Sequence, residues 1–323
     1  MLNVRSDYLV ILVATYNRLN LLKRTLRSIA SSTRCSQETI VIDGGSTDGT
    51  IEYLRSHPAV TSVFQGTLLG TARCYNKVWR QIESRYTCWL SDDTEVVPGS
   101  LDLAVDILQA SRDIGMVGLK MKDVVGPWKS APYMGALSEY GILNCNHGVL
   151  PTDLLRSVGY FNEGYRSYTI DPDLTASILC SGRKVVMTKR VSVLHHREWA
   201  EHEGTDKIMR EMRGIDNARI YRRKFEYLAQ PRTLSLARRL KNRIFTYLER
   251  ILPLKTGSDS LRFGLNRRDF RNVTCGRFIR LSDPLKNRKN PYHLVQSIPT
   301  KFLAREANPY CHLFSSNGAG DFE

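Results

Sequence analysis

Apolar and polar residues follow one another along the first 200 residues in a pattern that predicts strands alternating with helices. The run YLVILVA (8–14) is apolar throughout and ends at the polar TYNR, which is typical of a strand buried on both faces. In NLLKRTLRSIASS (20–32), apolar residues recur at helical spacing and predict an amphipathic helix. The same two patterns predict strands at 39–43, 61–65, 86–90 and 115–120 and helices at 70–85 and 98–111.

This alternation indicates the fold class. Strands and helices spaced as in βαβ units predict an α/β fold with a mainly parallel, doubly wound sheet. The rhythm breaks at 121–146, which is rich in Gly, Pro and aromatic residues and which we interpret as a long loop or an irregular strand pair. Beyond it, the patterns predict helices at 152–159 and 171–182 and strands at 184–187 and 191–196.

Charge divides the chain into two parts. The 323 residues have a formal net charge of +15, and residues 205–323 hold 25 Lys and Arg against 11 Asp and Glu, so the first 204 residues are nearly neutral. We therefore predict a folded domain at 1–204 and a basic, mainly helical C-terminal region at 205–323. Within that region, LSLARRLKNRIFTYLERIL (234–252) has the pattern of a basic amphipathic helix. Such a helix either lies on an anionic membrane surface or packs its apolar stripe on the domain.

Several function classes lose support from what the sequence lacks. Seven cysteines include no C-x-x-C pair, which disfavours zinc and redox motifs and favours a reducing compartment. No apolar run reaches the ~20 residues of a membrane-spanning helix, and the N-terminus does not resemble a signal peptide. We expect a cytoplasmic protein that associates peripherally with the inner membrane face. The absence of G-x-G-x-x-G after the first strand and of G-x-x-x-x-G-K-[ST] anywhere argues against dinucleotide cofactors and P-loop hydrolysis.

Polar side chains stand at the ends of the predicted strands, where open parallel sheets bind ligands. The first strand ends at TYNR (15–18), the second at Asp43, and the fourth at the adjacent carboxylates Asp92 and Asp93. Neighbouring carboxylates raise the cost of ionising each other, so either this strand end is open to water or something positive lies beside it. Oxygen ligands of this kind suit Mg²⁺ or Mn²⁺, and either ion can also hold a diphosphate.

Five segments, in this order, resemble the family 2 inverting glycosyltransferases, which have the GT-A fold. VATYNRLNLLKRTLRSIASS is similar to their opening strand, loop and helix, and TIVIDGGSTDGT to their second strand and turn. GTARCYNKV resembles the segment in which an Arg approaches the nucleotide phosphates. LSDDTEVVPGSL resembles their metal-binding strand end, most closely that of rhamnosyltransferase-like members. The segment 159–196 resembles the acceptor half, so the resemblance extends from residue 8 to about 197.

The resemblance implies a donor half at about 1–120, an acceptor half at about 121–204, and roles for individual residues. Asp43 is expected on the nucleotide base and Arg73 near the diphosphate. Asp171 is implied as the catalytic base that takes the proton of the acceptor hydroxyl. The implied nucleotide-sugar-binding residues are Thr15, Tyr16, Arg18, Asp43, Arg73 and Asp92, and the implied metal ligands are Asp93 and His195, with His196 as the alternative to His195.

Two positions depart from the family pattern. Ile170 stands where the family has Glu, which leaves Asp173 as a competing candidate for the base, and the metal motif reads Ser91-Asp92-Asp93 rather than Asp-x-Asp.

The activity implied by the resemblance is transfer of a sugar from a nucleotide-diphosphate donor, with Mn²⁺ or Mg²⁺, to a hydroxyl of a glycan or lipid-linked acceptor. The configuration at the sugar would be inverted, and the product would belong to a cell-surface polysaccharide or glycolipid. Ile170 suggests one alternative, a non-catalytic protein of the same fold that binds a sugar nucleotide or glycan. The basic region suggests another, a nucleic-acid-binding protein. Because that region contains no recognised nucleic-acid module, we expect no nucleic-acid partner.

Overall fold

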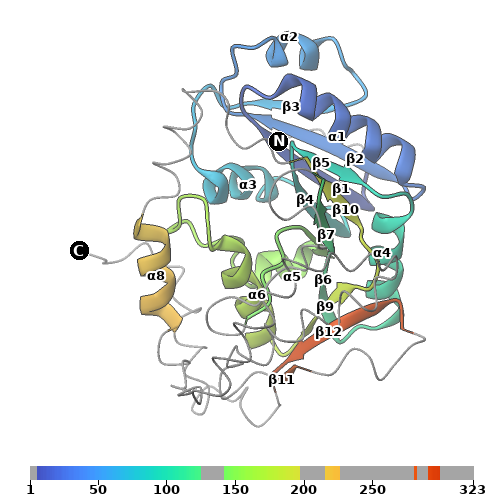
Figure 1. Ribbon diagram of the computed structural model, residues 1–323, viewed down its shortest axis with the longest axis vertical. Helices are drawn as coiled ribbons and strands as arrows, with labels where there is room; N and C mark the ends of the chain where they lie inside the picture. Colours follow the sequence, from blue (N-terminus) through green and yellow to red (C-terminus); the bar gives the residue numbers. More distant parts are fainter. Residues whose placement is uncertain (1–5, 125–141, 197–214, 226–279, 282–289, 299–323) are drawn as a thin grey trace, which may run out of the picture.

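The structure is a computed structural model that describes residues 6–124, 142–196, 215–225, 280–281 and 290–298 (Figure 1). These residues form one large mixed sheet flanked by helices and one small sheet beside it. The order of strands is β11-β12-β9-β6-β8-β4-β1-β2-β3 in the large sheet and β5-β10-β7 in the small one. The predicted α/β fold with a mainly parallel sheet at its centre is confirmed.

The centre of the large sheet positions the candidate site. Its parallel strands are β1 (Leu9–Thr15), β2 (Gln37–Asp43), β3 (Thr61–Phe64) and β4 (Tyr86–Ser91). β1 lies between β2 and β4 and is parallel to both, with Thr15 opposite Asp43 and Ala14 opposite Ser91. The three strands therefore end at one edge, and the polar segments that follow them start side by side.

The other half of the large sheet contains antiparallel strands. Its members are β6 (Ile114–Gly118), β8 (Gly148–Pro151), β9 (Lys184–Thr188), β11 (Arg280–Leu281) and β12 (Tyr292–Ser297). β8 runs antiparallel to both of its neighbours, β4 and β6, and β12 runs antiparallel to β9. The sequence patterns did not predict β8 or β12. β12 shows that the basic C-terminal region returns to the sheet of the folded domain, so the boundary placed at residue 204 remains a prediction.

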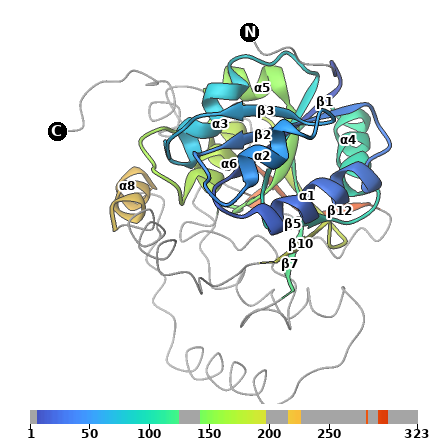
Figure 2. The ribbon, with the colours of Figure 1, turned by 90° about the horizontal axis from the view of Figure 1, so that it is seen from above.

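Helices cover both faces of the sheet (Figures 1 and 2). On one side lie α1 (Leu19–Ser32), α2 (Thr50–Arg55) and α4 (Ser100–Ala110), and on the other α3 (Thr71–Trp79), α5 (Thr152–Ser157) and α6 (Ile170–Cys180). β1 shows why its run is apolar throughout. Leu9, Ile11 and Val13 pack with α1 and α4, whereas Val10 and Leu12 pack with α3, α5 and α6. Burial on both faces thus requires an apolar residue at every position.

The small sheet lies next to the end of β4. It consists of β5 (Thr94–Val96), β7 (Met121–Asp123) and β10 (Val193–His195). β10 pairs with β7 in parallel and with β5 in antiparallel, and these pairings put His195 opposite both Asp123 and Thr94. β7 lies in the region that we interpreted as a loop or irregular strand pair.

The C-terminal region contributes one described helix, α8 (Ile215–Phe225), whose Tyr221 is buried in the core beside α6. The predicted amphipathic helix at 234–252 lies outside the described residues. Among the helices that are described, none is both long and apolar enough to cross a membrane.

Candidate functional site

The loops after β1 and β2 are joined by hydrogen bonds. Asn17 forms two hydrogen bonds with the loop after β2: its backbone N–H donates to Oγ of Ser46 at 2.9 Å, and its Oδ1 accepts from the N–H of Thr47 at 2.7 Å. Asp48 accepts the N–H of Leu19, the first residue of α1, at 2.9 Å. These contacts fix the chain around Arg18, which lies between Asn17 and Leu19.

Asp43 is fully buried at the end of β2 and accepts hydrogen bonds from the turn that follows it. Its Oδ1 accepts the N–H groups of Gly45 and Ser46 at 2.9 and 3.0 Å, and its Oδ2 accepts the Ser46 hydroxyl at 2.5 Å. Gly45 has φ +96°, and a Cβ there would lie 2.8 Å from the carbonyl oxygen of Gly66. The Gly-Gly pair therefore allows the tight turn that surrounds this carboxylate.

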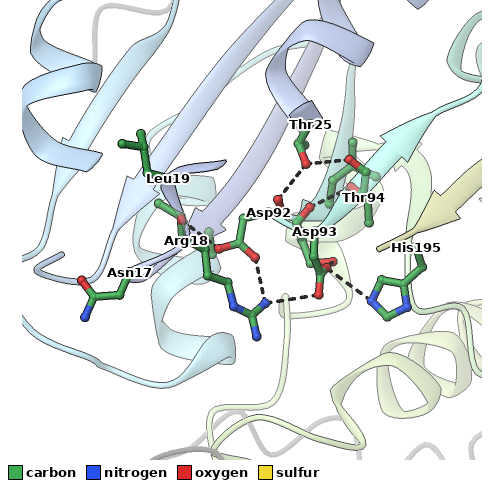
Figure 3. A network of polar contacts seen from close by, with 12 residues as sticks. Asn17, Arg18, Leu19, Thr25, Asp92, Asp93, Thr94 and His195 are labelled. Carbon is green, nitrogen blue, oxygen red and sulfur yellow. Dashed lines mark hydrogen bonds and ion pairs between the residues drawn. The ribbon is translucent and has the colours of Figure 1, made fainter. Parts of the chain in front are cut away.

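Asp92 and Asp93 form a buried acidic pair at the end of β4 (Figure 3). Thr15 donates its hydroxyl to Oδ2 of Asp92 at 2.8 Å. Nη1 of Arg18 reaches both carboxylates, at 3.1 Å from Oδ1 of Asp92 and 3.2 Å from Oδ2 of Asp93. Side chains from the ends of two neighbouring strands and their loops thus meet at one point.

The two carboxyls of this pair differ electrostatically. Burial raises the pKa of Asp92 above its ordinary value, and Arg18 only partly opposes the rise. Burial acts in the same direction on Asp93, but hydrogen bonds and charge from His195, together with Arg18 and Ser91, hold the pKa of Asp93 below its ordinary value. Asp93 is therefore the member of the pair that stays ionised most readily.

His195 lies between two carboxylates. Its Nε2 is 3.3 Å from Oδ1 of Asp93, and its Nδ1 is 2.8 Å from Oδ1 of Asp123 (Figure 3 shows the first contact). The β7–β10 pairing supplies Asp123, which orients the ring so that Nε2 points toward the acidic pair. His196 faces elsewhere, with its Nε2 2.7 Å from Oε2 of Glu95. Of the two histidines, His195 is the one at the acidic pair.

Asp93 and His195 fit a divalent cation as two of its ligands. A carboxylate oxygen and an imidazole nitrogen are ligands that Mn²⁺ accepts, and a second carboxylate behind the histidine is common at metal sites. The described residues contain no group of three or more His, Cys, Asp and Glu that could hold an ion by themselves. A cation here would need oxygen ligands from a substrate, which suits ions that bind phosphates.

Sequence reasoning missed three residues of this cluster. Ser91 donates to Oδ1 of Asp93 at 2.6 Å, Asp123 orients His195, and His147 lies behind both, with Nε2 3.5 Å from Oγ of Ser91. Burial and the charge of His195 lower the pKa of His147 to about 3, and its buried Nδ1 has no hydrogen-bond partner among the described residues. Asp123 lies within the region without periodicity and His147 directly follows it, so no sequence pattern pointed to either of them.

Asp171, the implied base, lies in the first turn of α6 near the indole of Trp89. α6 begins at Ile170, and Thr169 occupies the N-cap position before it. Thr169 has φ +71°, which is strained for a β-branched residue. Asp171 is partly exposed, and loss of water around its carboxyl raises the pKa to about 8, with only partial opposition from a hydrogen bond with Trp89.

Asp173, the competing candidate for the base, is buried, and its carboxylate is bonded to two other side chains. Its Oδ2 accepts the Tyr165 hydroxyl at 2.8 Å and the ammonium group of Lys224 at 2.6 Å, and its side chain is 3% exposed. Lys224 belongs to α8, so this contact joins α8 to α6. Of the two carboxyls, Asp171 is the one left for an external proton.

Three of the implied donor residues lie outside the hydrogen-bonded cluster: Asp43, which is bonded to its own turn, Tyr16 and Arg73. Arg73 lies on α3 with a largely exposed side chain, its Nε 3.9 Å from Oε2 of Glu163. Tyr16 is partly buried beside Gly44. The structure therefore brings Thr15, Arg18, Asp92, Asp93 and His195 together, and it leaves Arg73 near the surface.

The sequence and the fold were compared with those of known proteins. Residues 10–151 match the family model described as Glycosyl transferase family 2. A curated relative from Mycobacterium tuberculosis, N-acetylglucosaminyl-diphospho-decaprenol L-rhamnosyltransferase, is 24% identical over 236 aligned positions, which cover 59% of this chain and 77% of that protein.

Solved glycosyltransferase structures share the fold. The mannosyltransferase PcManGT from Pyrobaculum calidifontis, in complex with GDP-Man and Mn²⁺, is similar with a TM-score of 0.50 and 17% identity over 82% of this chain and 74% of that one. S. aureus TarS 1–349, in complex with UDP-GlcNAc, has a TM-score of 0.51 and 15% identity over 88% of this chain and 99% of that one. At 17% and 15% identity, these similarities show a shared fold and nothing further.

Proposed function

We propose that this chain, whose residues 10–151 match the model of glycosyl transferase family 2, is an inverting enzyme of that family with a lipid-linked or glycan acceptor. The family assignment makes it a nucleotide-sugar-dependent glycosyltransferase. The observation that supports this proposal is the buried cluster of Asp92, Asp93 and His195 at the edge where β1, β2 and β4 end. That edge is where an open parallel sheet binds its ligand.

The donor nucleotide would lie over the joined loops after β1 and β2. Asp43 would contact the base, and Thr15, Tyr16 and Arg18 would line the same pocket. Asp92 would contact the ribose or donor sugar. Arg73, which is exposed on α3, would have to leave Glu163 to reach the diphosphate. An arginine is suited to that role because its planar guanidinium can bind two phosphate oxygens at once.

Asp93 and His195 would hold a divalent cation, with Asp123 fixing the ring of His195 and Ser91 fixing the carboxylate of Asp93. Such a cation, when bound, stabilises negative charge on a departing diphosphate. Mn²⁺ and Mg²⁺ both fit this set of ligands, and Mn²⁺ is named in the complex of PcManGT.

Asp171 would act as the general base. Its raised pKa, about 8, gives it the proton affinity that a base needs near neutral pH. This carboxylate would take the proton of the acceptor hydroxyl as its oxygen attacks the anomeric carbon. Because that attack comes from the face opposite the departing nucleoside diphosphate, the configuration at the sugar is inverted. Asp173 is less suited, because Tyr165 and Lys224 already occupy its carboxylate.

The acceptor proposal rests on the curated relative. Its name describes a rhamnosyltransferase whose acceptor is a sugar carried on a decaprenyl diphosphate. We propose a similar acceptor for this chain, together with a role in cell-surface polysaccharide or glycolipid synthesis and peripheral attachment to the inner membrane face through the basic region. Residue 170 supports one rival, a non-catalytic binder, because Ile170 packs in the apolar core at the position where the family has Glu.

A transfer assay tests the proposal and separates it from its rival. Purified protein is given a panel of UDP-, GDP- and dTDP-sugars, an N-acetylglucosaminyl-diphospho-polyprenol and Mn²⁺. The anomeric configuration of the product is then read by NMR. Product with inverted configuration supports the proposal, and product with retained configuration contradicts it. Nucleotide binding without release of nucleoside diphosphate from any pair would favour the non-catalytic rival.

A further inference from the structure

A cavity lies at the edge of the sheet opposite the candidate site. It has a volume of about 520 Å³ and is formed where β4, β6 and β9 begin and where β8 ends. In the sheet these strands are neighbours, in the order β9-β6-β8-β4, so the segments that flank them converge on one place. Cavities of this size fall in the range that small ligands occupy.

Four arginines line this cavity, each from a different segment of the chain. Arg85 precedes β4, Arg112 lies in the turn between α4 and β6, Arg156 lies on α5, and Arg183 precedes β9. Residues so far apart in sequence meet only because the fold places those four segments at the same edge.

None of these four arginines forms an ion pair with a carboxylate in the described part of the chain. Arg156 donates to the carbonyl of Ile82 at 3.3 Å, and Arg183 donates to the carbonyl of Arg112. Arg85 stands over the ring of Tyr86, 5.4 Å from its centroid. Backbone oxygens and an aromatic ring therefore orient guanidinium groups whose charge remains uncompensated.

The acids nearby do not cancel this charge. Asp113 is already paired with Lys184. Glu83 and Asp153 also line the cavity and, like the four arginines, are exposed, so the lining keeps an excess of two positive charges. A cavity with this excess of positive charge favours an anion that carries more than one negative charge.

We propose that this cavity is a second ligand site that binds a small, multiply charged phosphate anion of the diphosphate class. Planar guanidinium groups bind phosphate oxygens in pairs, and four of them around one cavity can serve two phosphate groups at once. The site is separate from the donor site, because β4, whose carboxyl end lies at the donor site, begins at this cavity. The proposal of this second ligand site rests on the arginines around the cavity. It is independent of the acceptor and of the inverting mechanism proposed above.

Calorimetric titration with inorganic diphosphate tests this site. The buffer holds low salt and EDTA, because a donor site without its cation presents the acidic pair and disfavours an anion. The wild type should bind one diphosphate. Arg112→Gln combined with Arg183→Gln should weaken binding at least about 10-fold, because two charge-assisted contacts are lost. Arg27→Gln, a matched loss of an exposed charge on α1, should bind as the wild type does.

Hydrogen exchange locates the bound anion. Diphosphate should slow exchange at 108–114 and 151–156, which flank the cavity. The proposal is overturned if the folded wild type binds no diphosphate, if the double variant binds it equally well, or if protection appears at 15–18 instead. Binding to vesicles of phosphatidylglycerol without binding of free diphosphate would also overturn it, since it would identify a lipid surface as the partner.

Discussion

The ammonium group of Lys224 donates a hydrogen bond to Oδ2 of Asp173 at 2.6 Å, and both side chains are shielded from water. This pair joins α8 to α6 and gives Asp173 a structural function. Of the two carboxyls of the IDPDL segment, Asp173 is therefore the one that joins two helices, and Asp171 is the one that we propose as the base.

Lys224→Met should therefore destabilise the protein. It removes one partner of a buried ion pair and leaves the carboxylate of Asp173 with Tyr165 alone. We expect a loss of about 3 kcal/mol and a Tm lower by roughly 6 °C or more, as measured by calorimetry. Lys77→Met, at an exposed position on α3, should leave the Tm within about 1 °C of the wild type. Equal Tm values for the Lys224 variant and the wild type would show that the pair does not hold α8 in place.

Asp171→Asn should abolish turnover and keep donor binding. Removal of a general base costs about 100-fold or more in kcat, whereas the nucleotide contacts lie on other residues. Steady-state kinetics and nucleotide titration on the same preparation separate the two effects. If Asp171→Asn retains most of its kcat while a folded Asp173→Asn loses it, the assignment of the base is reversed.

The raised pKa of Asp171 predicts a pH dependence of both rate and stability. The base acts when deprotonated, so kcat/KM should rise with pH toward about 8 and then level off. The free energy of unfolding changes with pH in the opposite direction to the rate. The unfolded carboxyl loses its proton near pH 4, so holding the folded one protonated costs stability progressively as pH rises from about 4 to about 8.

Asp171→Asn removes that cost. Its Tm should exceed that of the wild type by at least about 2 °C at pH 8 and match it at pH 4, in thermal scans at the two pH values. Asp106→Asn, at an exposed position of α4, is the control and should show no such difference between pH 4 and pH 8. A rate profile that is flat between pH 6 and 9 would contradict the role given to Asp171.

Asp123→Asn should weaken Mn²⁺ binding by about 10- to 100-fold, because the carboxylate behind a metal-binding histidine fixes its ring and raises its basicity. Titration with Mn²⁺ followed by electron paramagnetic resonance measures the free ion directly and does not depend on activity. Glu95→Gln alters the partner of His196 instead and should leave the affinity unchanged. A larger effect of Glu95→Gln than of Asp123→Asn would identify His196 as the ligand.

The sequence predicted the parts of the fold that have strong periodicity. β1 is apolar at nearly every position because both of its faces are covered, and α1 repeats apolar residues because only one of its faces is buried. β8 and β12 were missed. Each follows a segment without periodicity, and each owes its place to pairing with distant strands, β4 and β9, which local patterns do not encode.

The candidate site was predictable to the same extent. Carboxylates at the ends of β2 and β4 are visible in the sequence because strand ends are visible. The partners of His195 and Ser91 were not, since Asp123 and His147 come close to them only through strand pairing in the small sheet and beside β8. The resemblance supplied the role of Asp171, but the helix boundary and the Lys224 pair, which together separate it from Asp173, come from the folded chain.

We propose that Asp93 and His195 hold a cation that binds a nucleotide diphosphate at the end of β4. Calorimetric titration of UDP, GDP, dTDP and CMP, with and without Mn²⁺, tests it most directly in the wild type, Asp93→Ala and the control Asp106→Ala. We predict that one nucleoside diphosphate binds only with Mn²⁺, that Asp93→Ala abolishes this binding, and that Asp106→Ala retains it. Failure of the folded wild type to bind any nucleotide, or equal binding by Asp93→Ala, would contradict the claim.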